Sequence, residues 1–578
     1  MKTVFILFLF LSVCSGVYAQ TPFIRLVQPV KTPILTSNAK QYISGATCTT
    51  CSISVNGKSV KVYATGGFAA ALNLIPGDTT IQIVATLDGK SVSKSLQYKY
   101  QIPVPPQPTK ALAVESIETF PEGNLILKAG DKINFKVKAL SHCIVKAWST
   151  FPLYEMPLSA TKGMPGIYQG SYTIQPTDSF FQSKIPITIT DSAGQKITKE
   201  SKYTLGVLSK LASETGITKG RLAHLEYGLG DDRLGGAKIG YVDSNIVLKI
   251  SGKFGTHYRV QLTDNRTAYI PEEHLALLPK GYPEPASLTD KIIVNGDAQN
   301  DYVKIGLFAK LPYQSFQLTD PSRIIVDVFG ASNNTNWITR FNTAKEIDKV
   351  DYEQIAENIF RVTIHLVHQQ HWGHQLYYSG NQLVIKVRRQ PETLSLKNLI
   401  IGVDAGHGGT NPGGVGPTGS VEKDITLLLS KKLQQALEKE GAKVIMSRNK
   451  EMYFDNKERI LFYRDSLPQL LLSIHLNSSD NPIESGGTST YYRYIGFRNL
   501  SGFIYDHLLE LGLKEYGHTG SFNFMLNSPT EYPNALIEML FLSNPEEEAK
   551  ILDSIFQQQM VDKIIAGIKD FLNACKED

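Results

Sequence analysis

The chain shows two hydrophobic patterns, and the change between them falls at about residue 392. Before it, apolar and polar residues alternate in short runs such as Ser52–Val55, Lys132–Val137 and Ile185–Thr190. Runs of period two predict β-strands with one buried face. After it, continuous apolar runs at Leu399–Val403 and Leu470–Ile474 are separated by a helical pattern with one apolar face. We therefore predict several small all-β modules followed by a C-terminal α/β domain, with a mainly parallel or mixed sheet flanked by helices.

Proline clusters mark the boundaries between these modules. Pro103, Pro105, Pro106 and Pro108 lie within a few residues of one another and form a stiff linker by composition. A later block closes with Pro279, Pro283 and Pro285. The predicted domains are β-modules at residues 20–102, 109–205, 212–280 and 290–390, and the α/β domain at residues 397–575.

The first three β-modules resemble known bacterial domains. The first two alternate in period two, with turns such as Asn56-Gly57, and resemble immunoglobulin-like sandwiches. In the third, Tyr258, Val260 and Leu262 alternate ahead of Ala268–Pro271, and this ending resembles SH3-like domains. An unclassified small barrel fits the third block equally well.

The fourth β-module contains an internal repeat, in which residue pairs 59 positions apart match. The matching positions are Val303, Ile305 and Leu307 with Val362, Ile364 and Leu366, and Tyr313 with Trp372. The repeat favours a duplicated β-hairpin. Residues 290–390 thereby resemble the AMIN module, a small β-domain found ahead of cell-wall amidases, and the resemblance implies that the module localises the protein to the cell envelope.

Two clusters of metal-ligand residue types occur in the β-modules. His365, His368, His371 and His374 stand at every third position, which in a strand sends successive side chains to opposite faces, so we expect surface or turn histidines and no metal site. Cys48 and Cys51 form a C-x2-C pair without a second pair, which argues against structural zinc. A disulfide or two loop thiols remain open for this pair.

Composition and charge narrow the class of protein. The chain has 578 residues, too many for one hydrophobic core, and 42% hydrophobic residues exclude disorder over most of its length. Lys and Arg total 59 against 54 acidic residues, a net charge of +5. So small an excess over this length argues against nucleic acid as a partner.

The first residues predict export. Lys2 precedes an apolar run from Val4 to Val13, and Val17-Tyr18-Ala19 places small side chains where a signal peptidase cuts. We predict a signal peptide at residues 1–19 and a periplasmic or otherwise envelope-associated protein. Leu11–Cys14 loosely resembles a lipobox, although Val13 stands where a small residue is expected. The run falls short of the roughly 20 residues that span a bilayer, so no membrane span is expected.

Candidate chemistry is confined to the α/β domain. The strand Leu399–Val403 ends in a glycine-rich loop that contains His407, Glu422 opens the amphipathic helix, and the second buried strand ends in His475. In isolation Glu422 would be an ordinary first-turn carboxylate. Two histidines and a carboxylate, however, are ligands of a hydrolytic zinc ion, whose remaining position holds water.

A hydrolytic zinc centre also needs a general base that is not a ligand. Glu538 is a lone carboxylate in the apolar run Leu536–Leu542. Burial there would raise its pKa toward the working pH, as a base that later acts as an acid requires. His507 and His518 lie in the same domain, and we expect core or surface roles for them, with His518 as the substitute if a ligand fails.

The order of these motifs resembles a known enzyme family. The stretches DAGHGG, EKDI, SIHLNSS and IEMLFLSNPEEE occur in residues 397–575 in the order found in zinc-dependent N-acetylmuramoyl-L-alanine amidases of the Amidase_3 family. The resemblance implies one Zn²⁺ held by His407, Glu422 and His475, with Glu538 as catalytic base and acid. It implies cleavage of the amide between N-acetylmuramic acid and the L-alanine of the stem peptide, with peptidoglycan as substrate and as the surface bound by the β-modules. Arg459 matches a recurrent family arginine, to which we assign a structural role.

Two alternatives stay open at this point. The chain could be an inactive wall-binding scaffold, because the β-modules carry no catalytic signature, or a zinc peptidase acting on the same stem peptide. Only 62 residues separate His475 from Glu538, without room for the insertion that occludes the zinc in some family members. We therefore predict an open site that needs no activator protein.

Overall fold

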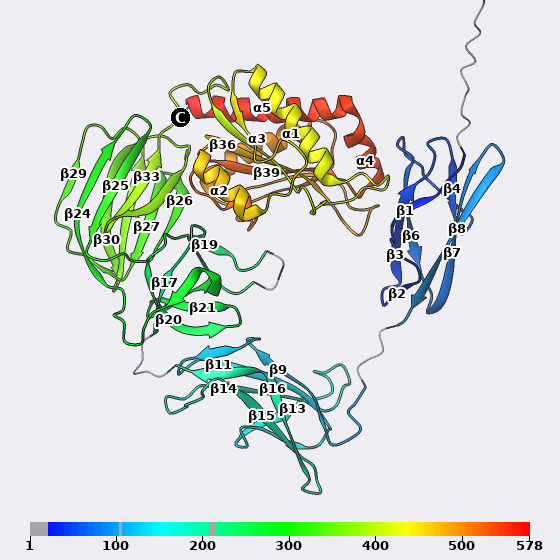
Figure 1. The fold of residues 1–578 in the computed structure, drawn as a ribbon, viewed down its shortest axis with the longest axis horizontal. Coiled ribbons are helices and arrows are strands. Elements are labelled where there is room, and N and C mark those ends of the chain that lie inside the picture. The colour runs from blue at the N-terminus through cyan, green and yellow to red at the C-terminus, as the bar shows by residue number, and fades with distance from the viewer. Residues whose placement is uncertain (1–20, 103–106, 209–213, 231, 233, 578) are drawn as a thin grey trace, which may run out of the picture.

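The computed structural model describes residues 21–102, 107–208, 214–230, 232 and 234–577 (Figure 1). The predicted signal peptide lies outside these residues. Among the helices within the described ranges, none is long and apolar enough to cross a membrane. The order of structure is as the hydrophobic pattern predicts: strands up to β33, then a domain of alternating helices and strands. The predicted fold class is confirmed.

The first domain is built from two sheets that enclose their own core. One sheet has the order β1-β3-β6 and the other β2-β8-β7-β4-β5. Asn56 and Gly57 both have positive φ and form the tight turn between β4 and β5, as their dipeptide predicts. The strands are β1 (Arg25–Gln28), β2 (Ile34–Thr36), β3 (Lys40–Ala46), β4 (Ser52–Val55), β5 (Lys58–Val60), β6 (Gly67–Asn73), β7 (Gly77–Leu87) and β8 (Lys90–Tyr100). Cys48 and Cys51, between β3 and β4, form a disulfide.

The second and third domains share one continuous hydrogen-bonded ladder. The short strand β10 pairs in parallel with β16 of the second domain and antiparallel with β20 of the third. Arg259 and Asp131 form a largely buried ion pair across the same boundary. The strands are β9 (Val114–Phe120), β10 (Leu125–Leu127), β11 (Lys132–Ala139), β12 (Ile144–Ala147), β13 (Phe151–Glu155), β14 (Ile167–Thr173), β15 (Ser183–Thr190), β16 (Lys196–Val207), β17 (Glu214–Thr218), β18 (His224–Glu226), β19 (Lys238–Tyr241), β20 (Val247–Phe254), β21 (His257–Thr263), β22 (Arg266–Pro271) and β23 (Leu275–Leu277), with η1 (Glu272–His274) before β23. The immunoglobulin-like and SH3-like resemblances stay predictions.

In the fourth domain, the two copies of the sequence repeat are distributed over two sheets. Each copy forms two antiparallel hairpins, β24–β25 and β26–β27 in the first and β30–β31 and β32–β33 in the second. The two hairpins of a copy go to different sheets, one with the order β24-β25-β33-β32 and the other β26-β27-β31-β30. The two copies are interlocked through the pairs β25–β33 and β27–β31. The strands are β24 (Ser287–Gly296), β25 (Asn300–Leu307), β26 (Tyr313–Thr319), β27 (Ser322–Phe329), β28 (Ala331–Ser332), β29 (Ile338–Arg340), β30 (Ile347–Ala356), β31 (Ile359–Leu366), β32 (His374–Ser379) and β33 (Gln382–Arg388).

The C-terminal domain is a six-stranded sheet of order β35-β34-β36-β39-β37-β38, covered by helices. The strands β35, β34, β36 and β39 are parallel, and β37 runs antiparallel to β39. Helices α1, α3 and α5 cover one face. The elements are β34 (Ile400–Ala405), α1 (Glu422–Lys439), β35 (Lys443–Ile445), α2 (Asn456–Ser466), β36 (Leu470–Asn477), β37 (Thr488–Tyr491), η2 (Ile495–Phe497), α3 (Arg498–Leu509), β38 (Glu515–Thr519), η3 (Met525–Asn527), β39 (Asn534–Phe541), α4 (Pro545–Leu552) and α5 (Ser554–Glu577).

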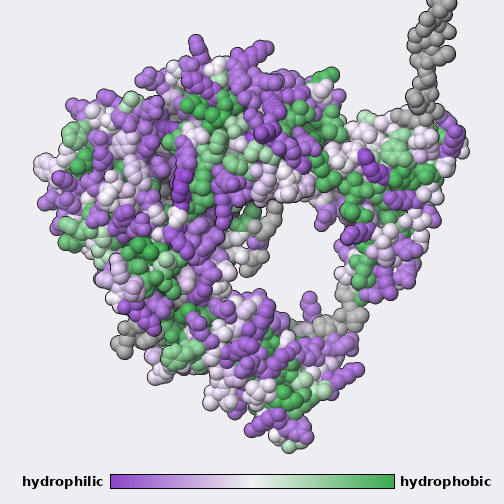
Figure 2. All heavy atoms as spheres, in the orientation of Figure 1, coloured by the Kyte–Doolittle hydropathy of each residue, from purple (hydrophilic) through white to green (hydrophobic). Residues whose placement is uncertain are grey.

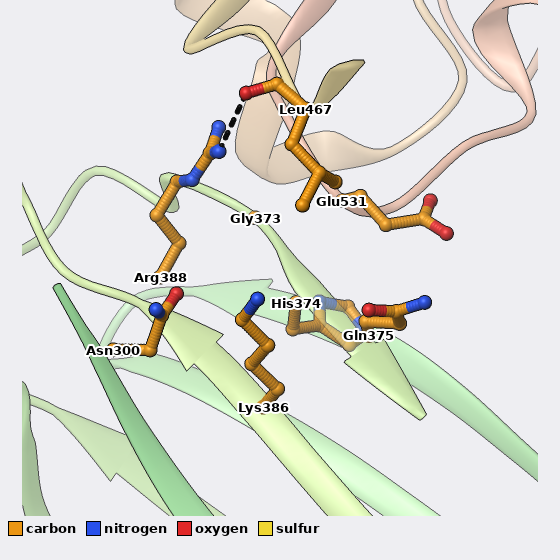
Figure 3. A pocket seen from close by; sticks show the side chains of 8 residues that line it. All are labelled: Asn300, Gly373, His374, Gln375, Lys386, Arg388, Leu467 and Glu531. Atoms are coloured by element: carbon orange, nitrogen blue, oxygen red, sulfur yellow. Dashed lines mark hydrogen bonds between the residues drawn. The ribbon is translucent and has the colours of Figure 1, made fainter. Parts of the chain in front are cut away.

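The third and fourth domains share hydrophobic cores with the C-terminal domain. Trp372, just before β32, is 2% exposed and packs on Phe571 of α5 with ring centroids 5.8 Å apart. Leu222 of the third domain is buried with residues of α2, η3 and β36. Arg388 of β33 donates a hydrogen bond to the carbonyl oxygen of Leu467, the residue that ends α2, over 2.8 Å (Figure 3). These domains therefore form one packed body.

The histidine repeat in the fourth domain corrects one expectation. The four side chains have different partners and do not converge: His365 pairs with Asp351 and His368 with Glu346. His371 and His374, however, are only 1% and 2% exposed, so the expectation of surface side chains is wrong for them, although His371 does lie in the turn before β32. They are buried because the loop before β32 packs against the C-terminal domain, a long-range contact that strand periodicity does not contain.

The first domain contacts the C-terminal domain through polar side chains. Arg25 donates a hydrogen bond to the carbonyl oxygen of Thr418, Gln28 donates to that of Asp480, and Lys40 pairs with Glu484. Gly67 of β6 lies against α4, on the side of the C-terminal domain that faces β1 and β6 (Figure 1). Apart from this contact, an open space separates the first domain from the packed body (Figure 2).

Candidate metal centre

Three side chains from separate segments converge at the carboxyl end of the parallel strands. His407 follows β34, Glu422 is the first residue of α1, and His475 is near the end of β36. The Oε1 atom of Glu422 lies 3.1 Å from Nε2 of His407 and 3.1 Å from Nδ1 of His475. Among the described residues, only these three form a group of His, Cys, Asp or Glu ligand atoms with every pair within 4.8 Å. The geometry brings together the three ligands that the sequence predicts.

Glycine makes the close approach of these segments feasible. A side chain at Gly406 would place its Cβ 2.4 Å from the ring of His475. At Gly413, which has φ of +69°, a Cβ would lie 2.4 Å from Oε2 of Glu422. The glycines at these two positions therefore let the loop pass close to His475 and Glu422.

Each candidate ligand is oriented by further hydrogen bonds. Nδ1 of His407 lies 3.0 Å from Oδ1 of Asn411, which leaves Nε2 directed at Glu422. The carboxylate of Glu422 accepts hydrogen bonds from the backbone N–H groups of Gly414 and Leu476. His407 itself has a left-handed backbone with φ of +61°, and Arg459 donates to its carbonyl oxygen. Such second contacts fix the tautomer and orientation of metal ligands.

The electrostatics favour an ionised carboxylate between two imidazoles. Burial alone raises the pKa of Glu422, but the hydrogen bonds and charges of His407 and His475 outweigh it and hold that pKa well below its usual range. For His407, burial lowers the pKa, and Glu422 more than compensates, so the net pKa is raised. An anionic, 3%-exposed carboxylate flanked by histidine nitrogens at 3.1 Å fits a tetrahedral cation such as Zn²⁺, whose bonds to N and O are about 2.0–2.2 Å.

Glu538 lies on the strand next to His475. The two residues are directly paired in the parallel register of β36 and β39, so their side chains leave the same face of the sheet. Glu538 is partly buried, and on its other side it pairs with Ser489 of β37. The candidate base therefore stands beside the three-ligand group without belonging to it.

The remaining histidines of the domain have other partners. Nε2 of His518 lies 2.9 Å from the hydroxyl of Ser501, and His507 pairs with Asp570 and Glu510. Neither belongs to the three-ligand group. The side chains of His407 and His475 remain 23% and 18% exposed.

Sequence reasoning missed several residues that hold these segments in place. Glu548 of α4 is fully buried and accepts hydrogen bonds from Thr418 and Ser420, in the loop before Glu422. Asp404 is fully buried and pairs with Arg459, for which the sequence suggested only a structural role. Arg448 is also buried, beside the segment Ala405–Gly406 that leads to His407. A charged residue adjoining an apolar run is the signal that could have marked Asp404, which directly follows Leu399–Val403.

Comparisons with known proteins agree with this geometry. Residues 401–570 match the model of the N-acetylmuramoyl-L-alanine amidase family, and residues 291–389 match that of the AMIN domain. The C-terminal domain is therefore an amidase domain of that family, and the fourth domain is an AMIN domain, as its sequence repeat predicts.

Relatives and solved structures are similar to the amidase domain. The probable cell wall amidase LytH of Staphylococcus aureus is 32% identical over 200 residues, which are 34% of this chain and 66% of that relative, so the chain spans just under two thirds of its length. An N-acetylmuramoyl-L-alanine amidase from Clostridium difficile 630 is 29% identical over 31% of this chain and 98% of that chain, with a TM-score of 0.30. The catalytic domain of CwlV from Paenibacillus polymyxa is 29% identical over 30% and 98% of the two chains, with a TM-score of 0.29.

Proposed function

We propose that the protein is a zinc-dependent peptidoglycan hydrolase that cleaves the amide between N-acetylmuramic acid and the L-alanine of the stem peptide. The observation that carries the proposal is the convergence of His407, Glu422 and His475 in an amidase-family domain, with Glu538 on the adjacent strand. The three ligands would leave one tetrahedral position for water. An intact set of ligands and base argues against an inactive scaffold.

The residues of the chain would divide the reaction between them. When bound, zinc would lower the pKa of its water toward about 7 and polarise the scissile carbonyl. Glu538 would accept a proton from the attacking water and then deliver it to the leaving nitrogen of alanine, because one group within reach of both can serve in both steps. Asn411 and the backbone N–H groups of Gly414 and Leu476 would keep His407 and Glu422 oriented throughout.

Replacement of Glu538 tests the assignment. The variant E538Q should bind one zinc per chain and release no stem peptide from purified peptidoglycan, because the ligands stay while the base is lost. Zinc content by elemental analysis and products by mass spectrometry provide the readouts. Undiminished cleavage by E538Q would refute the role of Glu538. Glycan free of peptide with an intact lactyl group identifies an amidase, whereas cleavage within the stem peptide would identify a peptidase.

We further propose export to the cell envelope and activity without an activator. Support for export comes from the apolar segment at Val4–Val13 and from the AMIN domain. Support for an open site comes from the exposed fractions of His407 and His475. In addition, α3, the α-helix between His475 and Glu538, packs against α5 and β37, away from the candidate metal centre. Purified protein that stays inert on peptidoglycan until an envelope extract is added would contradict the second part.

A further inference from the structure

Arg448 joins the two segments that carry His407 and Glu422. It lies shortly after β35, and its side chain is 1% exposed. Its Nε donates a hydrogen bond to the carbonyl oxygen of Ala405 over 3.0 Å, and Nη2 donates to that of Gly406 over 2.8 Å. The same Nη2 donates to the carbonyl oxygen of Lys423, in the first turn of α1, over 2.8 Å. One guanidinium thus bridges the loop before His407 and the helix turn that begins with Glu422.

The bridge is made without a close counter-ion. The nearest ion-pair contact joins Nη1 of Arg448 to Oε2 of Glu451 at 4.0 Å, and Nη1 has no hydrogen-bond partner within the described part of the chain. Burial lowers the pKa of Arg448, and the nearby charge of Arg459 lowers it further. A buried cation held mainly by carbonyl groups is a poor device for stability, because its desolvation is not repaid by a close carboxylate.

The contacts of Thr426 reinforce the same bridge. Its hydroxyl donates to the carbonyl oxygen of Gly406 over 2.8 Å and lies 3.2 Å from Nη2 of Arg448. Arg459 acts differently, because it binds Asp404, Ala405 and His407, at the end of β34 and just after it, and the carbonyl oxygen of Phe454, and none of these groups belongs to α1. Arg448 and Thr426 are thus the buried side chains that link the loop to the helix, and Lys423 adds a further link through the carbonyl oxygen of Gly409.

We propose that Arg448 is a positioning residue that fixes the distance between His407 and Glu422 and so tightens metal binding. The two ligand atoms are 3.1 Å apart, and a shift of the loop relative to the helix would separate them. The planar fork of Arg448 places its donors on separate nitrogens, Nε for Ala405 and Nη2 for Gly406 and Lys423. A lysine ammonium has all its donors on one flexible nitrogen, so it cannot reproduce these two fixed donor positions. The inference deepens the proposed function, on which it rests for the identity of the metal.

The test is the affinity for Zn²⁺ of the full chain carrying R448K, measured by competition with a chromophoric chelator. We expect the dissociation constant to rise about 10-fold, the lower end of the cost of losing a hydrogen-bond partner of a metal ligand, because Arg448 contacts the residues next to His407 and Glu422 and not the ligands themselves. The visible spectrum of the Co²⁺-substituted protein should change. In the cleavage assay, kcat should decrease by a larger factor than the factor by which KM changes. The matched control is R464K, which alters a partly buried arginine of the same domain that pairs with Glu531 and contacts no candidate ligand.

A second pair of variants covers the case in which R448K does not fold. T426V should weaken Zn²⁺ binding in the same direction, and T426S, which keeps the hydroxyl, should restore it. If R448K and T426V bind Zn²⁺ as tightly as the wild type, or if R464K weakens binding equally, the positioning role is wrong. If the wild type binds Zn²⁺ but cleaves no peptidoglycan, the proposed function fails, while the measured affinities still decide the role of Arg448.

Discussion

The AMIN domain and the first domain both contact the amidase domain, but by different means. The AMIN domain inserts Trp372 into the hydrophobic core beside α5, whereas the first domain touches the opposite side through Arg25, Gln28 and Lys40. Burial of an aromatic side chain is insensitive to salt, while exposed ion pairs are weak and screened. The difference indicates a permanent junction on one side and a releasable contact on the other.

The releasable contact lies next to the candidate metal centre. Thr418 lies in the loop before Glu422, and Asp480 follows the strand that carries His475. The first domain therefore holds two loops that border the candidate metal centre.

The largest expected effect follows from cutting the permanent junction. W372A should lower the free energy of unfolding by about 3–5 kcal/mol, the usual cost of removing a buried aromatic side chain. Chemical denaturation followed by fluorescence and circular dichroism would measure it. W337A is the matched control, because Trp337 in the same domain is 66% exposed. Equal losses for the two variants would mean that the junction is not a shared core.

The next largest effect is a loss of folding stability at acidic pH. Burial lowers the pKa of His371 to about 4 and that of His374 to about 3. In the unfolded chain a histidine has a pKa of about 6.5, so between pH 6.5 and pH 4 the unfolded chain binds protons at these two side chains and the folded chain does not. The free energy of unfolding is therefore highest above pH 6.5 and decreases as the pH drops toward 4. Between pH 7 and pH 5 the loss should be about 2 kcal/mol per histidine.

Matched variants isolate the contribution of these two histidines. Thermal unfolding at a series of pH values should show a flatter profile for the double variant H371Q/H374Q than for the wild type. H142Q replaces a histidine whose side chain is 92% exposed and should leave the profile unchanged. Parallel profiles for wild type and double variant would show that the buried histidines do not carry the acid sensitivity.

The smallest effect on stability is expected at the releasable contact. K40E places two acidic groups where Lys40 and Glu484 now pair, so the first domain should move away from the amidase domain while Tm stays the same. Small-angle X-ray scattering should show a larger radius of gyration, and 1 M salt should have the same effect on the wild type. K40E/E484K should restore the compact form. A wild-type radius that does not respond to salt would contradict a releasable contact.

Local signals in the sequence predict the elements of the amidase domain and the three side chains that converge at the end of its sheet. His407 follows a strand, Glu422 opens a helix and His475 lies near the end of a strand, and each of these elements is clear from periodicity. Parallel strands bring their carboxyl ends to one edge of the sheet. Arg448 has no such signal, since its role depends on carbonyl groups that are brought together only in the fold. The burial of His371 and His374 and the docking of Arg25 on Thr418 depend in the same way on surfaces from distant parts of the chain.

The interlocked AMIN repeat has a consequence for how such a domain assembles. Each sheet needs strands from both copies, so a single copy would leave the partner-facing edges of β25 and β27 unpaired. Two separate copies could complete both sheets only as a twofold symmetric homodimer, whose formation depends on concentration. Fusion of the copies into one chain makes the pairing intramolecular, so this domain assembles equally well in a dilute compartment.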